Sequence, residues 1–370
     1  SPTPCAYIRL LQPLDHPAAG SGARVLMTDA KSVLDYDVDI IVTQRYALPD
    51  LAAADALAAH ARHTGAALVY DLDDDLLNIP TNHPDAAELR PRARIVRRML
   101  EKADAVWLST QSLKESLSSI RPDAVVIENR LDERIWTSAT MPRPFRDEPV
   151  RILCMGTSTH NRDFAMIEPA LARLKEEYGD RVVIDVLGMT NQGSIAPGLN
   201  RIGPPPQARR SYPGFVDWLT SVQPRWHIGL APLHDTAFNH CKSPIKTMDY
   251  AAMGMVVLAS DVPVYRGSVA DGPAGQLVAN DHRAWYAALD WLVRDQTLRR
   301  SIAGRAREAF LAHAALASHP DARREAWTRL LHSRAPGPVG GLRRAPSALT
   351  IPHDATDLVT RKRRLGGRGR

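Results

Sequence analysis

The sequence predicts an α/β protein made of two doubly wound, Rossmann-like domains whose parallel sheets face a shared cleft. First, short apolar runs rich in β-branched residues alternate with longer helical patterns along the chain. Second, these short runs are continuously apolar, which indicates strands buried on both faces and therefore parallel sheets. Third, the alternation stops once, at the proline-containing, mixed-charge stretch 137–150, and then starts again.

The first half of the chain contains six candidate strands and two clear helical patterns. The strands are expected at 6–11, 23–27, 39–45, 67–73, 105–110 and 124–129, and the helices at 51–65 and 92–103. This alternation is typical of strand–helix–strand units in a parallel sheet. We therefore assign residues 1–145 to an N-terminal domain.

The second half repeats the pattern. Its strands are expected at 151–156, 182–188, 227–233, 255–261 and 275–280, and its helices at 165–179, 215–222 and 283–313. We assign residues 146–332 to a C-terminal domain and residues 333–370 to a tail. In such folds a ligand is expected at the carboxyl ends of the strands.

The composition is that of a globular protein, neither membrane-spanning nor rich in disulfides. Charged residues make up 24% and hydrophobic residues 44%, and the longest strongly apolar run, about ten residues near 251–259, is half of what a membrane span needs. Cys5, Cys154 and Cys241 are odd in number and far apart, which favours a reducing cytoplasm and argues against a disulfide framework or a zinc site. The start at Ser1 without methionine is typical of a processed or cloned fragment.

The basic character of the chain is confined to its tail. Residues 341–370 contain eight Lys or Arg and two Asp, so they account for the formal net charge of +6. Because this segment is also rich in glycine, it is expected to be disordered. It would serve as a solubilising extension or linker, or contact anionic lipid headgroups at the inner face of the membrane. Nucleic acid is not an expected partner, since no recognition helix or RNA-binding aromatic motif accompanies the tail.

The stretch FNHCKSPIKTMDYAAMGMVVLASD, residues 238–261, predicts a helix whose start is flanked by two cations. Ser243 can cap free backbone N–H groups and Pro244 suits the first helical position, so the helix is expected to begin at Pro244. Lys242 and Lys246 flank this cap, where the helix dipole disfavours positive charge. Either both side chains extend into water, or they help the helix start to bind a phosphate or diphosphate.

A second cationic element follows the first strand of the second domain. In CMGTSTHNRDF, residues 154–164, Gly156 permits close backbone approach and Arg162 can make a bidentate contact to phosphate. Thr157 belongs to the same loop. The alternative is a surface ion pair between Arg162 and Asp163.

The most acidic stretch, YDLDDDLLNIP at 70–80, follows a predicted strand of the first domain. It contains Asp71, Asp73, Asp74 and Asp75. Three roles are open: a metal-binding Asp-x-Asp motif, a pair formed by Asp73 and Asp74 that holds or deprotonates an acceptor hydroxyl, and a carboxylate cluster favoured by a helix N-terminus.

The second half of the chain resembles the nucleotide-sugar domain of GT-B glycosyltransferases, specifically the retaining family 4. The resemblance covers about 150–315, through GTSTHNRDF, WHIGLAPLHDTAFNHCKSPIKTMDYAAMGMVVLASDVPVY and the two closing helices; the first half matches in strand order only. It implies that Lys246, with Lys242, binds the donor diphosphate and that Asp249 binds the ribose hydroxyls. Cys241 stands where family members carry a glutamate that touches the donor sugar, and a thiol cannot make that charged hydrogen bond.

The resemblance also implies that the donor lies between two loops. The donor-binding set is expected to comprise Gly156, Thr157, Asp235, Phe238, Asn239, Cys241, Lys242, Ser243 and Asp249. His160, His234 and His240 lie on loops that can reach the cleft and are expected to be solvated, whereas Trp218 and Trp226 are expected in the core.

The expected function is transfer of a hexose or deoxyhexose from a nucleoside diphosphate sugar to a hydroxyl of a glycan or lipid-linked acceptor, with retention, in polysaccharide or glycoconjugate assembly. Lys246 and Arg162 would stabilise the departing diphosphate, and Asp73 and Asp74 would face the acceptor. Neither a metal nor a cofactor is expected besides the nucleotide-sugar substrate. The alternatives are a non-catalytic glycan-binding or scaffolding module of a larger polysaccharide-assembly protein, suggested by Cys241, and a GT-B nucleotide-sugar epimerase.

Overall fold

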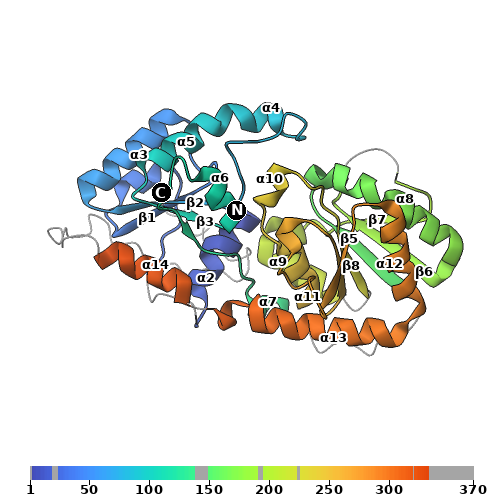
Figure 1. Cartoon of the computed structure of the whole chain (residues 1–370). Coiled ribbons are helices and arrows are strands. Elements are labelled where there is room, and N and C mark those ends of the chain that lie inside the picture. The colour runs from blue at the N-terminus through green and yellow to red at the C-terminus, as the bar shows by residue number, and fades with distance from the viewer. Residues whose placement is uncertain are drawn as a thin grey trace, which may run out of the picture.

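The structure is a computed structural model in which residues 2–18, 24–137, 149–190, 195–222, 226–319 and 321–332 are described. Their helices and strands form two α/β lobes that lie side by side, each built around one parallel sheet (Figure 1). The predicted fold class is confirmed.

The first lobe contains a four-stranded sheet with the order β1-β2-β3-β4. Its strands are β1 (Ile40–Gln44), β2 (Ala67–Leu72), β3 (Ala105–Leu108) and β4 (Val125–Val126), all paired in parallel. Its main helices are α3 (Leu51–Thr64), α5 (Ala93–Lys102) and α6 (Gln111–Leu117), with short helices at Ser32–Asp35, α4 (Ala86–Leu89) and Arg90–Arg92. The next short helix, α7 (Glu133–Trp136), packs into an apolar cluster of the second lobe through Trp136. The boundaries follow local chemistry: Asp50 accepts a hydrogen bond from the N–H of Ala53 at 2.8 Å, and α3 ends before Gly65, whose φ is 77°.

The second lobe contains a six-stranded sheet with the order β10-β9-β8-β5-β6-β7. The strands are β5 (Val150–Met155), β6 (Val182–Leu187), β7 (Leu199–Ile202), β8 (Ile228–Ala231), β9 (Val256–Ser260) and β10 (Gly275–Val278), again all parallel. The sequence did not predict β7. This strand lies at the edge of the sheet and exposes Asn200 and Arg201, so it lacks the continuous apolar run of a buried strand.

Helices cover both faces of the second sheet. One apolar cluster joins the sheet to α8 (Asn161–Tyr178) and α12 (His282–Arg294), another joins it to α9 (Tyr212–Val222) and α11 (Ile245–Ala252), and α13 (Gln296–His313) contributes to both. Shorter helices lie at Ser158–His160, Gly179–Arg181, Ala208–Arg210, α10 (Ala237–His240), Pro263–Tyr265 and Leu316–Ser318. Trp226 is buried and Trp218 packs against the core, as predicted.

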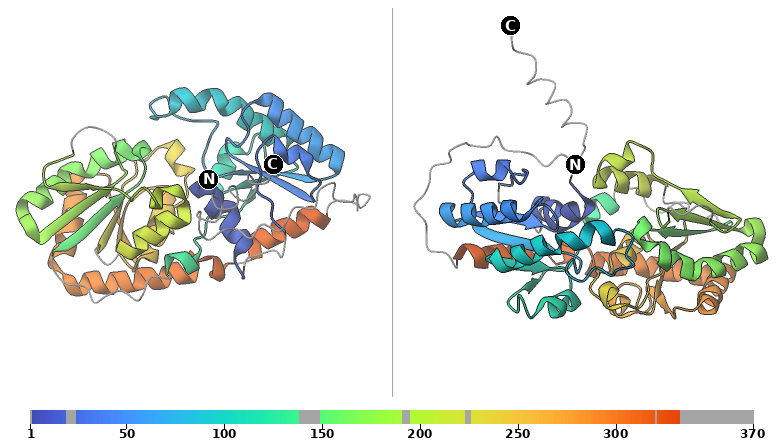
Figure 2. Two further views of the ribbon diagram at one scale, coloured as in Figure 1. Left: turned by 180° about the vertical axis from the view of Figure 1, so that it is seen from behind. Right: turned by 90° about the horizontal axis from the view of Figure 1, so that it is seen from above.

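The strand predicted at 6–11 is wrong, because this segment is helical. Residues Pro4–Ala6 form α1, Tyr7–Leu11 a π-helical stretch and Gln12–Asp15 α2. Tyr7, Ile8 and Leu11 share an apolar cluster with Tyr212 and Trp136, and Arg9 is fully buried. The segment lies between the lobes (Figures 1 and 2).

Two further predicted strands are corrected. Residues 24–27 of the segment 23–27 form no regular strand, and of the segment 124–129 only Val125–Val126 pair with β3. Beyond this pair the N–H of Ile127 still donates to the carbonyl oxygen of Leu108 at 2.8 Å, while its own carbonyl oxygen accepts a hydrogen bond from the guanidinium of Arg9. Arg9 also forms an ion pair with Asp71, with Nη2 2.6 Å from Oδ2.

The C-terminal helix α14 (Asp321–His332) returns to the first lobe, and α13 and α14 run one after the other along the two lobes (Figure 2). Trp327 stacks edge-on against Trp107 of β3, with ring centroids 4.6 Å apart. The helix that the sequence assigns to the second domain therefore packs on the first sheet. The predicted boundary near residue 145 falls in 138–148, and the tail is 333–370; both lie outside the described residues. Among the described helices, none combines the length and apolar character that a bilayer span requires.

Candidate active site

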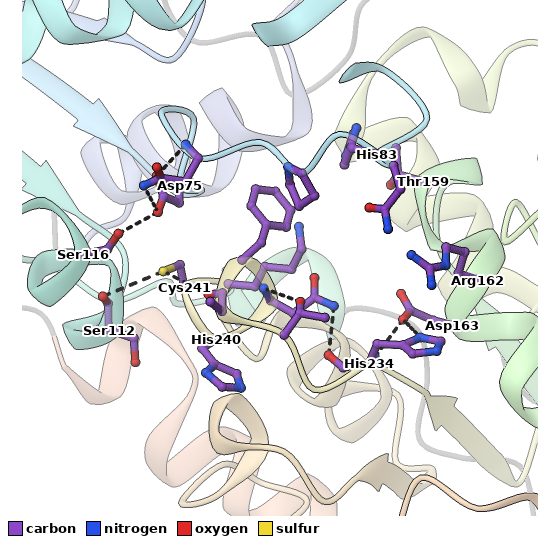
Figure 3. A pocket seen from close by; sticks show the side chains of 18 of the residues that line it. Asp75, His83, Ser112, Ser116, Thr159, Arg162, Asp163, His234, His240 and Cys241 are labelled. Atoms are coloured by element: carbon purple, nitrogen blue, oxygen red, sulfur yellow. Dashed lines mark hydrogen bonds and ion pairs between the residues drawn. The ribbon is translucent and has the colours of Figure 1, made fainter. Parts of the chain in front are cut away.

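A cavity of about 650 Å³ lies between the lobes, at the carboxyl ends of strands from both sheets (Figure 3). From the first lobe it is lined by residues that follow β2 and β3, including Asp75, Asn78, His83, Ser112 and Ser116. From the second lobe it is lined by residues that follow β5 and β8, including Thr159, His160, Arg162, Asp163, His234, Phe238, Asn239 and Lys242. This position agrees with the expectation that a ligand binds at the strand ends.

The structure brings only part of the predicted site to this cavity. Arg162, Phe238, Asn239, Cys241 and Lys242 line it. The other predicted residues, Asp73, Asp74, Gly156, Thr157, Asp235, Ser243, Lys246 and Asp249, do not. Several of these are nevertheless tied to the lining residues by direct contacts, which determine the charge of the site.

Lys242 connects the two lobes. Its Nζ lies 3.2 Å from Oδ1 of Asp74 and 4.7 Å from the centre of the Phe238 ring. Asp74 also accepts a hydrogen bond from Nη1 of Arg45 at 2.9 Å. Burial alone would raise the pKa of Asp74, but Lys242 and Arg45 lower it to about 2. Asp74 is therefore ionised at neutral pH, and its charge is already balanced.

The other aspartates of the acidic stretch also have partners. Asp73 forms an ion pair with Arg45, and the buried Asp71 accepts hydrogen bonds from Arg9 and Gln44. Asp75 accepts hydrogen bonds from Asn78 and from the hydroxyl of Ser116, at 2.9 and 2.6 Å. A turn rather than a helix follows these residues, so the helix N-terminus interpretation is wrong.

Arg45 has an unusual backbone conformation where it meets Asp73 and Asp74. Its φ is 48°, in the left-handed region that non-glycine residues rarely adopt. The phenolic hydroxyl of Tyr70 donates to the carbonyl oxygen of Arg45 at 2.8 Å and helps to hold this conformation. Such strain is typically maintained where it positions a side chain, here a guanidinium between two carboxylates.

The helix start at 243–246 differs from the predicted one. Helix α11 begins at Ile245 with Pro244 as its N-cap residue, and no side chain in the described part of the protein caps it. The predicted Ser243 cap is wrong because the Ser243 hydroxyl instead accepts a hydrogen bond from Nδ2 of Asn129, 2.7 Å away in the first lobe.

Lys246 is also paired with a carboxylate. Its Nζ lies 3.6 Å from Oδ2 of Asp249, one turn along α11. Asp249 is buried, and burial raises its pKa to about 6 although Lys246 acts in the opposite direction. Each lysine that flanks the helix start therefore already faces a carboxylate.

Phe238 and Cys241 belong to the second lobe but pack against the first lobe. Cys241 is buried within the apolar cluster of the first lobe, and Phe238 packs against the same cluster, with its ring 5.8 Å from that of His83. The carbonyl oxygen of Cys241 accepts a hydrogen bond from the hydroxyl of Thr110 at 2.9 Å. Burial raises the pKa of the Cys241 thiol to about 11, so it is neutral. An apolar side chain at 241 is thus explained by packing between the lobes.

The loop after β5 is packed tightly. The N–H of Gly156 donates to the carbonyl oxygen of Leu187 at 2.9 Å, and a Cβ at this position would lie 2.4 Å from Sδ of Met189. The space that the absent Cβ of Gly156 leaves is therefore occupied by the side chain of Met189. The hydroxyl of Thr157 is 2.7 Å from that of Thr159, which lines the cavity.

Asp163 forms a cluster that the sequence did not predict. Its carboxylate is 2.8 Å from Nδ1 of His160 and 2.9 Å from Nδ1 of His234, and it accepts the N–H of His234 at 2.8 Å. Burial would raise the pKa of Asp163, but the two histidines lower it. Its ion pairs among the described residues are with these histidines and not with Arg162, so the predicted alternative for Arg162 is wrong. The i, i+3 spacing of His160 and Asp163 could have indicated their contact from the sequence. His234 gave no such signal, because it is 71 positions from Asp163.

His160, His234 and His240 all reach the cavity. His240 pairs with Asp235, while the other two pair with Asp163. Their side chains are partly exposed, in line with the expectation that they are solvated, but each is also paired with a carboxylate. Figure 3 shows Arg162, Asp163 and His234 together on the wall that the second lobe contributes.

No protein-family model and no curated protein matches this chain. Its structure is similar to sucrose-phosphate synthase from Thermosynechococcus elongatus, with a TM-score of 0.58 and 13% identity over 80% of this chain and 74% of that one. It is also similar to a glycosyltransferase from Rickettsia africae ESF-5 (TM-score 0.57, 15% identity, 82% and 80% coverage) and to HepE from Anabaena in complex with UDP and glucose (0.56, 13%, 81% and 79%). At these identities the likeness establishes the fold: the chain has the GT-B architecture of two Rossmann-like domains.

Proposed function

We propose that this protein is a glycosyltransferase that transfers a hexosyl or deoxyhexosyl group from a nucleoside diphosphate sugar to a hydroxyl of a glycan or lipid-linked acceptor. The observation that carries the proposal is the cavity between the two lobes, where Arg162, Lys242 and three histidines converge from the second lobe. The GT-B fold supports it, and so does one structural neighbour, HepE, whose structure is a complex with UDP and glucose.

In this proposal the second lobe binds the donor. Lys246, Arg162 and the start of α11 stabilise the negative charge that grows on the diphosphate as the bond to C1 breaks. One such preorganised contact is worth roughly 100- to 1,000-fold in rate. Asp249 accepts hydrogen bonds from the ribose hydroxyls. Gly156 and Thr157 approach the phosphates, and Asp235, Phe238 and Asn239 lie beside the sugar.

The first lobe then receives the acceptor. In this proposal Asp73 and Asp74 hold the acceptor hydroxyl; neither lines the cavity, and their pairing with Arg45 keeps both carboxylates in fixed positions next to it. We further propose transfer with retention, in cytoplasmic assembly of a polysaccharide or glycoconjugate, with peripheral membrane contact through the basic tail. Neither a metal nor a further cofactor is required in this scheme, because protein cations supply the charge that the diphosphate needs.

One observation favours a second candidate, a non-catalytic glycan-binding or scaffolding module. The carboxylate that family resemblance would place at 241 is replaced by a buried thiol that packs into the first lobe. Loss of that carboxylate removes one expected contact to a donor sugar. Analysis of the reaction product would distinguish a GT-B epimerase from both candidates.

The decisive experiment is a thermal-shift screen of nucleoside diphosphates, followed by incubation of the matching nucleotide sugars. A glycosyltransferase should be stabilised by at least one diphosphate and should release it slowly from the nucleotide sugar by hydrolysis. A binding module would show no release at any enzyme concentration. An epimerase would return a nucleotide sugar with changed stereochemistry at one carbon.

A further inference from the structure

The His160–Asp163–His234 cluster leaves both rings with one free nitrogen. Asp163 is 6% exposed, and because its ionised carboxylate can only accept hydrogen bonds, Nδ1 of each histidine must carry a proton. Within the described part of the chain, Nε2 of neither ring has a protein partner. Each Nε2 is therefore available to a ligand, as an acceptor when the ring is neutral and as a donor when it is protonated.

The charge of the cavity explains why protonation matters. Lys242 is balanced by Asp74 and Lys246 by Asp249, at 3.2 and 3.6 Å. Arg162 lines the cavity without a carboxylate partner among the described residues. Asp163 supplies one negative charge to two imidazoles. With both rings protonated the cluster has a net charge of +1, and with Arg162 this wall of the cavity reaches +2.

We propose that His160 and His234, held by Asp163, bind the diphosphate of the donor together with Arg162 and take up a proton when it binds. The inference rests on the proposed function and identifies residues that the family resemblance did not. A diphosphate carries more than one negative charge at neutral pH, and both lysines that would face it are already paired with a carboxylate. A protonated imidazole adds one positive charge and one Nε2–H donor next to Arg162.

Other ionisable groups near the cluster do not replace this role. Cys154 and Tyr265 lie close enough to Asp163 to interact with its charge, and burial raises the pKa of both well above neutrality. They stay uncharged. From the first lobe, His83 also lines the cavity, beside Asp75 and Glu115, and burial lowers the pKa of His83. The variant His83→Asn separates its contribution from that of the cluster.

Isothermal titration calorimetry with UDP tests the proposal in two buffers of different ionisation enthalpy, such as HEPES and Tris. Between pH 7 and 8.5 the terminal phosphate of UDP is already ionised, since phosphate esters have a second pKa near 6. The full chain should take up about one proton per UDP bound, and its affinity should fall by up to roughly tenfold per pH unit. The double variant His160→Asn/His234→Asn should take up none. It should bind UDP at least roughly tenfold more weakly at pH 7.

His282→Asn is the matched control, because His282 is exposed on the far helix α12 and should leave both quantities unchanged. If the double variant does not fold, the single variants His160→Asn and His234→Asn decide in comparison with His83→Asn: uptake should fall in either single variant and persist in His83→Asn. UDP binding without proton uptake, or with uptake that persists in the double variant, overturns the inference but leaves the proposed function intact. If UDP and every other nucleoside diphosphate fail to bind, both are overturned.

Discussion

Replacing Asp249 by asparagine should stabilise the free protein and weaken its ligand binding. Burial raises the pKa of this carboxyl from 3.8 to about 6. The folded state therefore holds the proton more tightly than the unfolded state does. Keeping Asp249 ionised above pH 6 costs about 3 kcal/mol, since each pKa unit corresponds to about 1.4 kcal/mol. Asparagine has nearly the same shape and no charge, so Asp249→Asn should recover part of that energy.

Because the pKa of Asp249 is raised in the folded state, the difference in stability between Asp249→Asn and the parent should depend on pH. Below about pH 4 the carboxyl is protonated in both states and the variant should match the parent; the difference should open between pH 4 and 6 and level off above the folded pKa of about 6. Urea denaturation at pH 4.5, 6 and 8 measures it. Nucleoside diphosphate affinity, measured at pH 7.5, should fall by roughly 10- to 100-fold, because one charge-assisted hydrogen bond is worth about 1.5–3 kcal/mol.

Asp163→Asn is the comparison for which the opposite change in folding stability is expected, because the pKa of Asp163 is lowered and its charge is stabilised by two histidines. That variant should lose stability at neutral pH, with the loss shrinking as the pH falls through the range where the carboxyl protonates. A destabilisation of Asp249→Asn at pH 8 would refute the reasoning. It would mean that the contact with Lys246 outweighs the burial of the charge.

The remaining predictions concern the cations, the first lobe and the tail. Lys246→Ala should lower turnover by roughly 100-fold or more, with no effect of EDTA on the parent, and Lys246→Arg should restore only part; unchanged turnover in steady-state assays would remove Lys246 from the site. Asp74→Asn should leave diphosphate affinity in calorimetry unchanged or higher, because it removes the competing partner of Lys242, but should lower transfer; a loss of affinity that added manganese modulates would point to a metal site instead. Truncation after Ser333 should leave the melting temperature unchanged while weakening sedimentation with anionic vesicles, whereas a lower melting temperature would show that the tail packs on the protein.

The sequence was sufficient for the sheets because their signal is local. Most predicted strands of the second half appear within one or two residues of their expected bounds, since a buried parallel strand is a continuous apolar run. The N-terminal segment was predicted wrongly because a short apolar run such as YIRLL fits a buried strand and a buried helix equally well. In the structure the segment is a helix whose apolar residues share a cluster with the second lobe, while Arg9 pairs with Asp71, 62 positions away.

The partners of the candidate site residues could not be predicted for a similar reason. Lys242 and Lys246 were correctly singled out as cations at a helix start, but Asp74, the partner of Lys242, is 168 residues away in sequence. Cys241 stood out as a departure from a charged pattern. The explanation is that Cys241 is buried against the first lobe and accepts a hydrogen bond from Thr110. Both contacts join the two lobes, so the sequence alone could not reveal them. Long-range pairing, rather than local propensity, determines the charge of this site.

The pairing of Lys242 with Asp74 does not prevent this lysine from contacting a donor. Both side chains remain about a fifth exposed, so a ligand can reach Lys242. Its contact with Asp74 and a contact with a phosphate are both charge-assisted hydrogen bonds, worth about 1.5–3 kcal/mol each. Because a diphosphate offers more negative charge than one carboxylate, it would compete with Asp74 for Lys242. Release of Asp74 at that moment would leave Arg45 as its remaining cation and free one oxygen for the acceptor, so that donor binding prepares the acceptor side.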